Sequence, residues 1–129
     1  MIIGFDLDGV IAVNRPFLNL PRWLAPLTLL LIRAIPGARA KLRQIKHKGH
    51  KIVIVTARPR WAWFSTWLWL RIFRIPHHAL YIAWPWQKKL EILQKVGAKN
   101  YFDDKVKIVD FLRQNNFNAY LFEGWVKLG

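Results

Sequence analysis

Short apolar runs alternate along this chain with longer segments of helical periodicity. The apolar runs lie at residues 1–5, 51–55, 79–83, 99–102 and 118–122, and their length suits strands better than helices. The helical segments lie between them, at residues 38–48, 60–74, 87–96 and 105–115. Strands that alternate with helices form βαβ units with parallel strands. The sequence therefore predicts a three-layer α/β/α sandwich around a parallel, Rossmann-like sheet.

Length and composition favour one domain over residues 1–129. The 129 residues fall within the roughly 100–200 residues of a typical domain. Hydrophobic residues make up 53% of the chain, which excludes a disordered protein. The chain has no cysteine, which excludes a disulfide scaffold, a thiolate zinc site, an iron–sulfur cluster and a cysteine nucleophile.

Residues 14–36 do not fit the alternation, and we expect them to form a short, apolar helical cap insertion. Residues 23–32 are apolar on nearly every side, so the core, a partner copy or lipid should bury them. A membrane-spanning helix is excluded there, because it would put Asp6 and Thr56, which follow the first and second predicted strands, on opposite sides of the membrane. Shallow insertion into a membrane surface stays open.

The acidic residues are concentrated at the predicted strand ends. The chain has seven, of which Asp6 and Asp8 follow the first strand and Asp103 and Asp104 follow the fourth. Ligands of parallel α/β sheets bind beyond the carboxyl ends of the strands. Clustered carboxylates repel one another unless a cation neutralises them, and oxygen ligands alone favour Mg²⁺.

Three further features could take part in chemistry at this edge. Asp6 and Asp8, two positions apart, can act as nucleophile and proton donor, although an acidic strand end before a turn glycine has the same pattern. Thr56 can bind a phosphate oxygen or cap the next helix. Lys88 or Lys89 can neutralise phosphate, although a solvated lysine is the common case.

The order of these pieces resembles the haloacid dehalogenase-like (HAD) phosphohydrolase superfamily. The matching motifs are FDLDGV (5–10), IVTARP (54–59), QKKLE (87–91) and YFDDK (101–105). The 5′(3′)-deoxyribonucleotidase-like members are the most similar in pattern. The resemblance covers residues 1–12 and about 37–123, and it is specific for the superfamily rather than for a substrate.

The resemblance implies a role for each matching residue. Asp6 is the expected nucleophile and Asp8 the general acid and base, with Thr56 and Lys89 as the other catalytic residues. Lys89 is preferred to Lys88 because Lys89-x-Glu91 fits the family pattern better. The expected substrate-binding residues are Leu7, Gly9, Ala57 and Arg58. The expected ligands of Mg²⁺ are the carboxylate of Asp6, the carbonyl of Asp8 and a carboxylate of the Asp103 and Asp104 pair, with the choice between Asp103 and Asp104 left open.

The implied activity is Mg²⁺-dependent hydrolysis of a phosphomonoester through an aspartyl-phosphate, with a nucleotide-like substrate favoured. A lipid phosphate and a nucleic-acid terminal phosphate are the alternatives within that class. A catalytically silent HAD-fold protein that binds membranes or nucleic acid is the alternative from another class.

The charge of the chain indicates a polyanionic partner. Lys and Arg number 21 against seven acidic residues, for a net charge of +14. Nucleic acid, an anionic membrane surface and phosphorylated small molecules all fit this balance. The Trp- and Arg-rich segment 60–74 suits a bilayer interface, a base-stacking platform or a homodimer contact.

The amino-terminal sequence favours a cytoplasmic protein. It begins MIIGFDLDGV, which lacks the basic region of a secretory signal. We therefore expect a cytoplasmic location, with peripheral attachment to a membrane as an open alternative.

Overall fold

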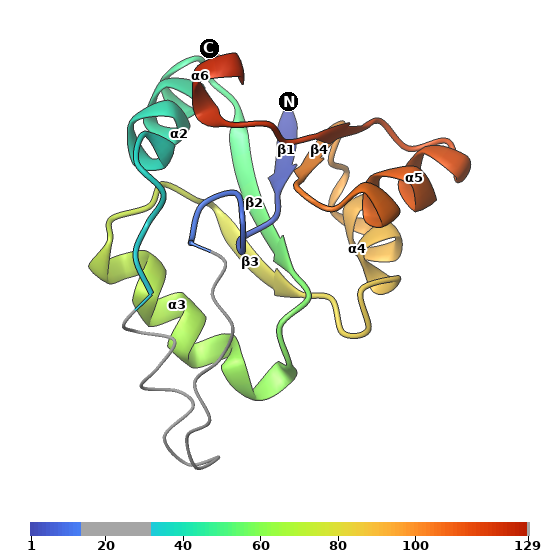
Figure 1. The fold of residues 1–129 in the computed structure, drawn as a ribbon, viewed down its shortest axis with the longest axis horizontal. Helices are drawn as coiled ribbons and strands as arrows, with labels where there is room; N and C mark the ends of the chain where they lie inside the picture. Colours follow the sequence, from blue (N-terminus) through green and yellow to red (C-terminus); the bar gives the residue numbers. More distant parts are fainter. Residues whose placement is uncertain (14–31, 129) are drawn as a thin grey trace.

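The computed structural model describes residues 1–13 and 32–128 (Figure 1). Its strands form one five-stranded sheet in the order β3-β2-β1-β4-β5, and every neighbouring pair is parallel. The strands are β1 (Ile2–Phe5), β2 (Lys51–Thr56), β3 (Ala79–Ile82), β4 (Asn100–Asp103) and β5 (Ala119–Leu121). The predicted parallel sheet is confirmed.

Helices cover the two faces of the sheet (Figure 1). On one face lie α2 (Ala38–His47) and α3 (Trp63–Ile72), the latter preceded by the 3-10 turn η2 (Arg60–Ala62). On the other face lie α4 (Lys88–Val96) and α5 (Val106–Gln114). Successive residues of a strand point to opposite faces, so β2 contributes Ile52 and Ile54 to the first layer and Val53 and Val55 to the second. The predicted three-layer α/β/α sandwich is confirmed.

A short helix near the carboxyl end, α6 (Trp125–Leu128), was not predicted. Four residues are too few for a helical period to emerge from the sequence. The helix is held by Trp125, whose indole N–H donates a hydrogen bond to the carbonyl of Val10 at 2.7 Å. The same ring packs against Phe5 and Phe122 at centroid distances of 5.7 and 5.0 Å. Tertiary packing therefore fixes this element.

The cap insertion predicted at residues 14–36 lies outside the described residues, except for 32–36. Beside it, Ala12 and Ala34 form an isolated antiparallel bridge, and the amide of Ile35 donates to the carbonyl of Ile11 at 2.7 Å. The insertion therefore leaves and rejoins the domain next to the loop after β1, and its helical cap stays a prediction. Of the helices in the described part of the chain, none is both long and apolar enough to cross a membrane.

Trp69 is the largest fully buried side chain described, and its truncation should be costly. Its indole donates to the carbonyl of Ile32 at 2.7 Å, and its ring packs on Phe73 at 4.6 Å. We expect Trp69→Ala to lower the free energy of unfolding by about 3–5 kcal/mol, measured by urea denaturation. Trp61→Ala is the control: this ring is 49% exposed, so its loss should change the same quantity by about 0.5 kcal/mol or less. Equal losses in the two variants would contradict the packing described.

Candidate active site

Three neighbouring strands bring the predicted site residues to one edge of the sheet. Asp6 directly follows β1, Asp103 ends β4 and Thr56 ends β2. The amide of Asp6 donates to the carbonyl of Phe102 at 2.9 Å, which places Asp6 level with the end of β4. Strands β2 and β3 lie on one side of β1, and β4 and β5 lie on its other side, so the topological switch point falls between β1 and β4. Such a switch point is where parallel sheets bind ligands.

A buried ammonium group lies at the centre of this edge. Lys89, near the start of α4, has only 1% of its side chain exposed, and its Nζ donates to Asp6 Oδ1 and Asp103 Oδ2, each at 2.9 Å. A third hydrogen bond joins Nζ to the hydroxyl of Tyr101 at 2.6 Å. All three protons of the ammonium group therefore have partners. Lys88 is exposed, which favours Lys89 as the functional lysine of the pair.

Burial and charge together set the ionisation of this group of side chains. The pKa of Asp6 is raised to about 7 as the balance of several effects: burial raises it most, Lys89 lowers it, and the Asp103 and Asp8 carboxylates raise it. Burial alone lowers the pKa of Lys89, but the carboxylates of Asp6 and Asp103 outweigh it and raise that pKa above its usual value. Lys89 therefore remains protonated at neutral pH.

Tyr101 is a member of the site that sequence reasoning missed. Its hydroxyl lies 2.9 Å from Asp103 Oδ2 and 3.3 Å from the carbonyl of Val55. Burial and the nearby carboxylates of Asp6 and Asp103 raise the pKa of Tyr101 well above its usual value, so the phenol keeps its proton. Residues two apart on a strand share a face, and its position two before Asp103 is the signal that could have found it.

Asp104 completes a cluster of three carboxylates that could hold a cation. One oxygen each from Asp6, Asp103 and Asp104 lies within 4.8 Å of the others. Both oxygens of Asp103 accept hydrogen bonds, Oδ2 from Lys89 and Tyr101 and Oδ1 from the amide of Lys105 at 3.0 Å. Asp104 Oδ1 is buried and has no hydrogen-bond partner among the described residues. Burial and then the charge of Asp103 raise the pKa of Asp104.

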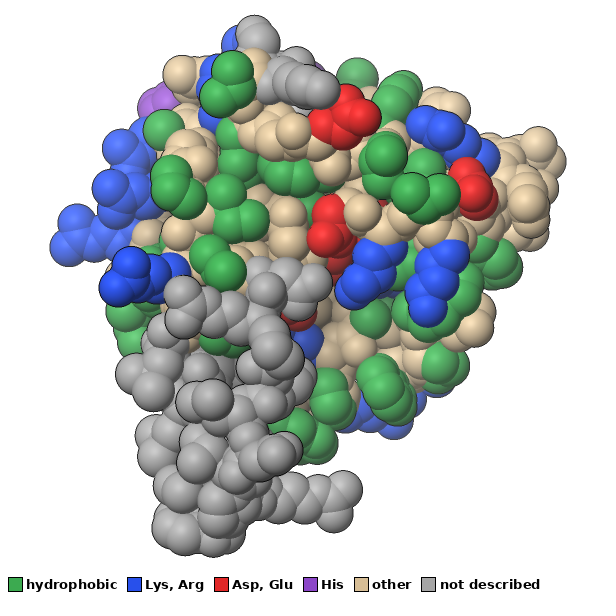
Figure 2. All heavy atoms as spheres, viewed as in Figure 1, with side chains coloured by type: hydrophobic (Ala, Val, Ile, Leu, Met, Phe, Trp, Pro, Cys, Tyr) green, Lys and Arg blue, Asp and Glu red, His purple; other side chains and the backbone are tan. Residues whose placement is uncertain are grey.

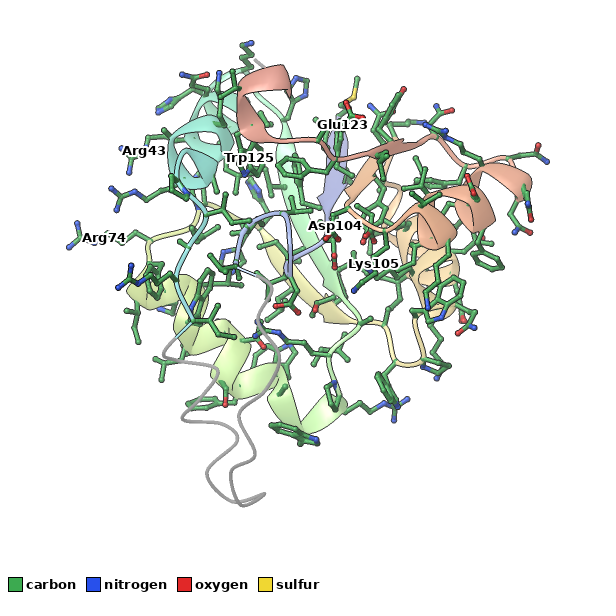
Figure 3. The ribbon with its side chains drawn as sticks, in the orientation of Figure 1. Arg43, Arg74, Asp104, Lys105, Glu123 and Trp125 are labelled. Carbon is green, nitrogen blue, oxygen red and sulfur yellow. The ribbon has the colours of Figure 1, made fainter. Side chains whose placement is uncertain are left out.

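This cluster fits Mg²⁺, which prefers oxygen ligands and a few carboxylates. A divalent cation would satisfy the unpartnered oxygen of Asp104 and offset the repulsion between the carboxylates. In the space-filling view of Figure 2, acidic side chains lie near the middle of the face beside Lys and Arg side chains. Figure 3 places Asp104 and Lys105 there, where β4 ends.

Asp8 lies apart from the carboxylate cluster and is held by Arg58. The Nε and Nη2 atoms of Arg58 donate to the two oxygens of Asp8 at 3.0 and 2.7 Å. Its Nη1 donates to the hydroxyl of Thr66 in α3 at 3.0 Å. The sequence analysis assigned metal binding to the backbone carbonyl of Asp8, so the pairing of its side chain with Arg58 does not conflict with that prediction. Arg58, predicted to bind substrate, also positions Asp8.

The loop after β1 is tightly turned. The amides of Ile11 and Ala12 both donate to the carbonyl of Leu7 at 2.9 Å, and the Gly9 amide donates to the Ala12 carbonyl at 2.8 Å. Gly9 has a φ of +87°, and a Cβ at this position would collide with the carboxylate of Asp104. Glycine is therefore required here both by the backbone and by the packing of Asp104.

A cavity of about 300 Å³ opens at this edge of the sheet. Asp6 and Asp8 form one wall, and the sequence from Ala57 to Pro59 forms another. Trp84 and Lys105, which the sequence analysis did not select, complete the lining. Thr56 is buried just behind, where its hydroxyl accepts from the amide of Arg58 at 3.4 Å. The cavity therefore presents two carboxylates, a guanidinium, an ammonium and an indole.

No protein-family model matches the chain. Two curated bacterial proteins are similar over part of it, and both carry the name "Putative nucleotidase". The protein of Oceanobacillus iheyensis is 34% identical over 84 residues, which is 63% of this chain and 44% of that protein. The protein of Bacillus cereus is 26% identical over 87 residues, which is 66% and 46% of the two chains. The match thus spans less than half the length of either relative.

Solved structures of hydrolases share the fold at low sequence identity. A hydrolase from Streptococcus pneumoniae is 13% identical with a TM-score of 0.70, and the match covers 98% of this chain and 95% of that one. A HAD-superfamily hydrolase from Geobacter sulfurreducens is 14% identical with a TM-score of 0.66, covering 93% and 88%. The D,D-heptose 1,7-bisphosphate phosphatase of B. bronchiseptica, solved with magnesium and phosphate, has 13% identity, a TM-score of 0.64, and coverage of 93% and 79%.

Sheet order, layer arrangement and these likenesses agree with one another. The resemblance that the four motifs predicted is confirmed: the chain has the fold of the HAD-superfamily hydrolases.

Proposed function

We propose that the protein is a Mg²⁺-dependent phosphatase that hydrolyses a phosphomonoester through an aspartyl-phosphate on Asp6. The observation that carries the proposal is the setting of Asp6. Its Oδ1 accepts a hydrogen bond from Lys89, and the residue lines the cavity together with Asp8. One carboxylate that can attack phosphorus and another that can move a proton therefore face the same space.

Mg²⁺ fits the cluster of Asp6, Asp103 and Asp104, with the unpartnered oxygen of Asp104 as the strongest support. When bound there, the ion would supply positive charge against which a phosphate dianion can approach the attacking carboxylate. Lys89 supplies a fixed positive charge on the buried side of Asp6. The solved phosphatase of the same fold that holds magnesium and phosphate supports this assignment.

The residues of the chain account for both halves of the reaction. A carboxylate oxygen of Asp6 forms a bond to phosphorus as the bond to the leaving oxygen breaks, and Asp8, which must enter this step with a proton bound, transfers that proton to the leaving oxygen. Asp8 then takes a proton from water as the water oxygen attacks phosphorus, and the bond to Asp6 breaks to release phosphate. Arg58 holds Asp8 in place for both proton transfers through its paired hydrogen bonds.

A nucleotide-like substrate is favoured by the lining of the cavity. Trp84 is 53% exposed and is the only aromatic side chain among the described residues that line the cavity, so it offers a ring on which a planar group can stack. Any nucleobase can stack on such a ring. The exposed Lys105 on the same lining can attract further anionic groups of the substrate. The names of the two curated relatives point in the same direction.

Asp6→Asn should reduce phosphate release by at least about 10³-fold, because the amide cannot attack phosphorus. The measurement is hydrolysis of an aryl phosphate in the presence of Mg²⁺. Asp110→Asn is the control: it makes the same chemical change at an exposed position on α5, away from the cavity. Unchanged hydrolysis by a folded Asp6→Asn protein would refute the covalent route. Absence of hydrolysis by the natural protein on nucleotides, sugar phosphates and phospholipids would favour the catalytically silent alternative.

Mg²⁺ should raise the stability of the natural protein but not that of Asp104→Asn. Binding at one hundred times the dissociation constant adds about 2.7 kcal/mol to the free energy of unfolding. The readout is the thermal midpoint with and without Mg²⁺, which is independent of activity. Asp110→Asn should respond to Mg²⁺ as the natural protein does. An equal response in Asp104→Asn would place the metal elsewhere.

Trp84→Ala should raise KM for a nucleoside monophosphate by about tenfold and leave KM for glycerol phosphate unchanged. The size follows from the loss of one stacked base, typically about 1–3 kcal/mol. Trp84→Phe retains a ring and should recover most of the difference. If the alanine variant raises KM for the two substrates equally, Trp84 has no part in recognising the base.

A further inference from the structure

The outer side of α3 carries large apolar side chains. Trp63, Phe64 and Ile72 are 43%, 62% and 59% exposed, and Trp61 of the preceding turn is 49% exposed. The two hydroxyl side chains of the helix, Ser65 and Thr66, are buried instead. A surface helix normally has the opposite arrangement, with its polar side chains toward water. These four residues, Trp61, Trp63, Phe64 and Ile72, are called the α3 face below.

Arginines flank the α3 face. Arg60 precedes Trp61, Arg71 lies in the last turn of the helix, and Arg74 follows it; all three are exposed. The guanidinium of Arg71 lies 5.0 Å from the centroid of the Trp67 ring, so cation and ring share one surface. Figure 3 shows Arg74 projecting outward on the same side of the molecule as Arg43 of α2, and Figure 2 shows Lys and Arg side chains gathered along this edge.

Neither α2 nor α3 carries an acidic residue. The sequence has no acidic residue between Asp8 and Glu91, and both helices fall within that stretch. The remaining acidic residues belong to the candidate active site, to α4 and α5, or to the segment before α6. Positive charge and exposed aromatic rings therefore occur together on one layer of the sandwich.

We propose that the α3 face binds the surface of an anionic lipid bilayer. Tryptophan and arginine are the side chains that suit the boundary between headgroups and acyl chains, where rings insert and guanidinium groups remain with lipid phosphates. The exposed aliphatic and phenyl groups of Ile72 and Phe64 add apolar surface to bury. Charge complementarity with anionic headgroups supplies the long-range attraction.

The same observations disfavour two other occupants. A second copy of the chain in a symmetric dimer would bring two identical, positively charged surfaces together, and neither α2 nor α3 has an acidic side chain to pair with the arginines. A nucleic acid would use stacking rings, but Ile72 has no ring, and Trp63 is already stacked on Trp67 at a centroid distance of 6.3 Å. The bilayer uses every member of the α3 face.

The α3 face begins at the rim of the cavity. Arg60 and Trp61 directly follow Pro59, which lines the cavity together with Asp6 and Asp8. A protein docked through the α3 face would therefore hold its cavity near the headgroups. The membrane proposal stands on surface chemistry alone and does not rest on the proposed phosphatase activity.

The test is co-sedimentation with vesicles of phosphatidylglycerol and phosphatidylcholine in equal parts, compared with phosphatidylcholine alone, at 0.1 M salt, where the screening length is about 10 Å. The natural protein should partition at least about tenfold more strongly to the anionic vesicles. Trp61→Ser with Phe64→Ser should reduce that partition by about tenfold or more. Tyr120→Ser is the matched control, since Tyr120 is 44% exposed on β5, outside the α2 and α3 layer.

A second pair of variants separates local from overall charge. Arg71→Gln with Arg74→Gln should weaken vesicle binding, whereas Lys95→Gln with Lys99→Gln, which removes the same charge from an exposed site on and after α4, should not. Equal losses in these two double variants would overturn the proposal, because total charge would then explain binding. The folded variant with Trp61→Ser and Phe64→Ser should also be tested for binding to a single-stranded oligonucleotide. The proposal would be overturned if this variant still bound vesicles, whether or not it had lost binding to the oligonucleotide.

Discussion

The buried ammonium group of Lys89 is the interaction on which the candidate site depends. It joins α4 to the ends of β1 and β4 through Asp6, Asp103 and Tyr101. Buried charges are tolerated when each is paired and hydrogen-bonded. Removal of one partner leaves the other charges unpaired in a medium of low dielectric constant. Lys89 therefore stabilises the arrangement of the carboxylates and, in the proposed reaction, also limits the negative charge that an incoming phosphate meets.

Around this centre, the parallel sheet provides the geometry and the loops provide the chemistry. Adjacent strands end at one edge, so residues nearly one hundred positions apart, such as Asp6 and Asp103, reach a single ammonium group. The tight turn at Gly9 leaves space that the carboxylate of Asp104 occupies. Arg58 then links the loop after β2 to Asp8 and to Thr66 of α3, so that all three strand ends are connected by polar contacts.

The sequence was sufficient for the fold class, because strand and helix alternation depends on local pattern, whereas the catalytic roles came from the family resemblance and stay predictions. Lys89 was separable from Lys88 only by family resemblance, and its burial explains the choice. The pairing of Arg58 with Asp8 could not be predicted, because it joins side chains 50 positions apart that local pattern does not relate. Tyr101 looked like an ordinary strand residue, and Trp84 was one of eight tryptophans with no periodicity to distinguish it. The helix α6 depends on contacts of Trp125 with distant residues.

The uneven charge of the helices on the two faces of the sheet has a consequence for how the molecule moves in an electric field. The helices α2 and α3 carry basic side chains and no acidic ones, whereas Glu91 and Asp110 offset part of the positive charge on α4 and α5, so the uneven charge gives the domain a dipole. A negatively charged body exerts a torque on such a dipole before any atoms touch. If the membrane proposal holds, this torque would turn the tryptophan-bearing side toward an anionic surface.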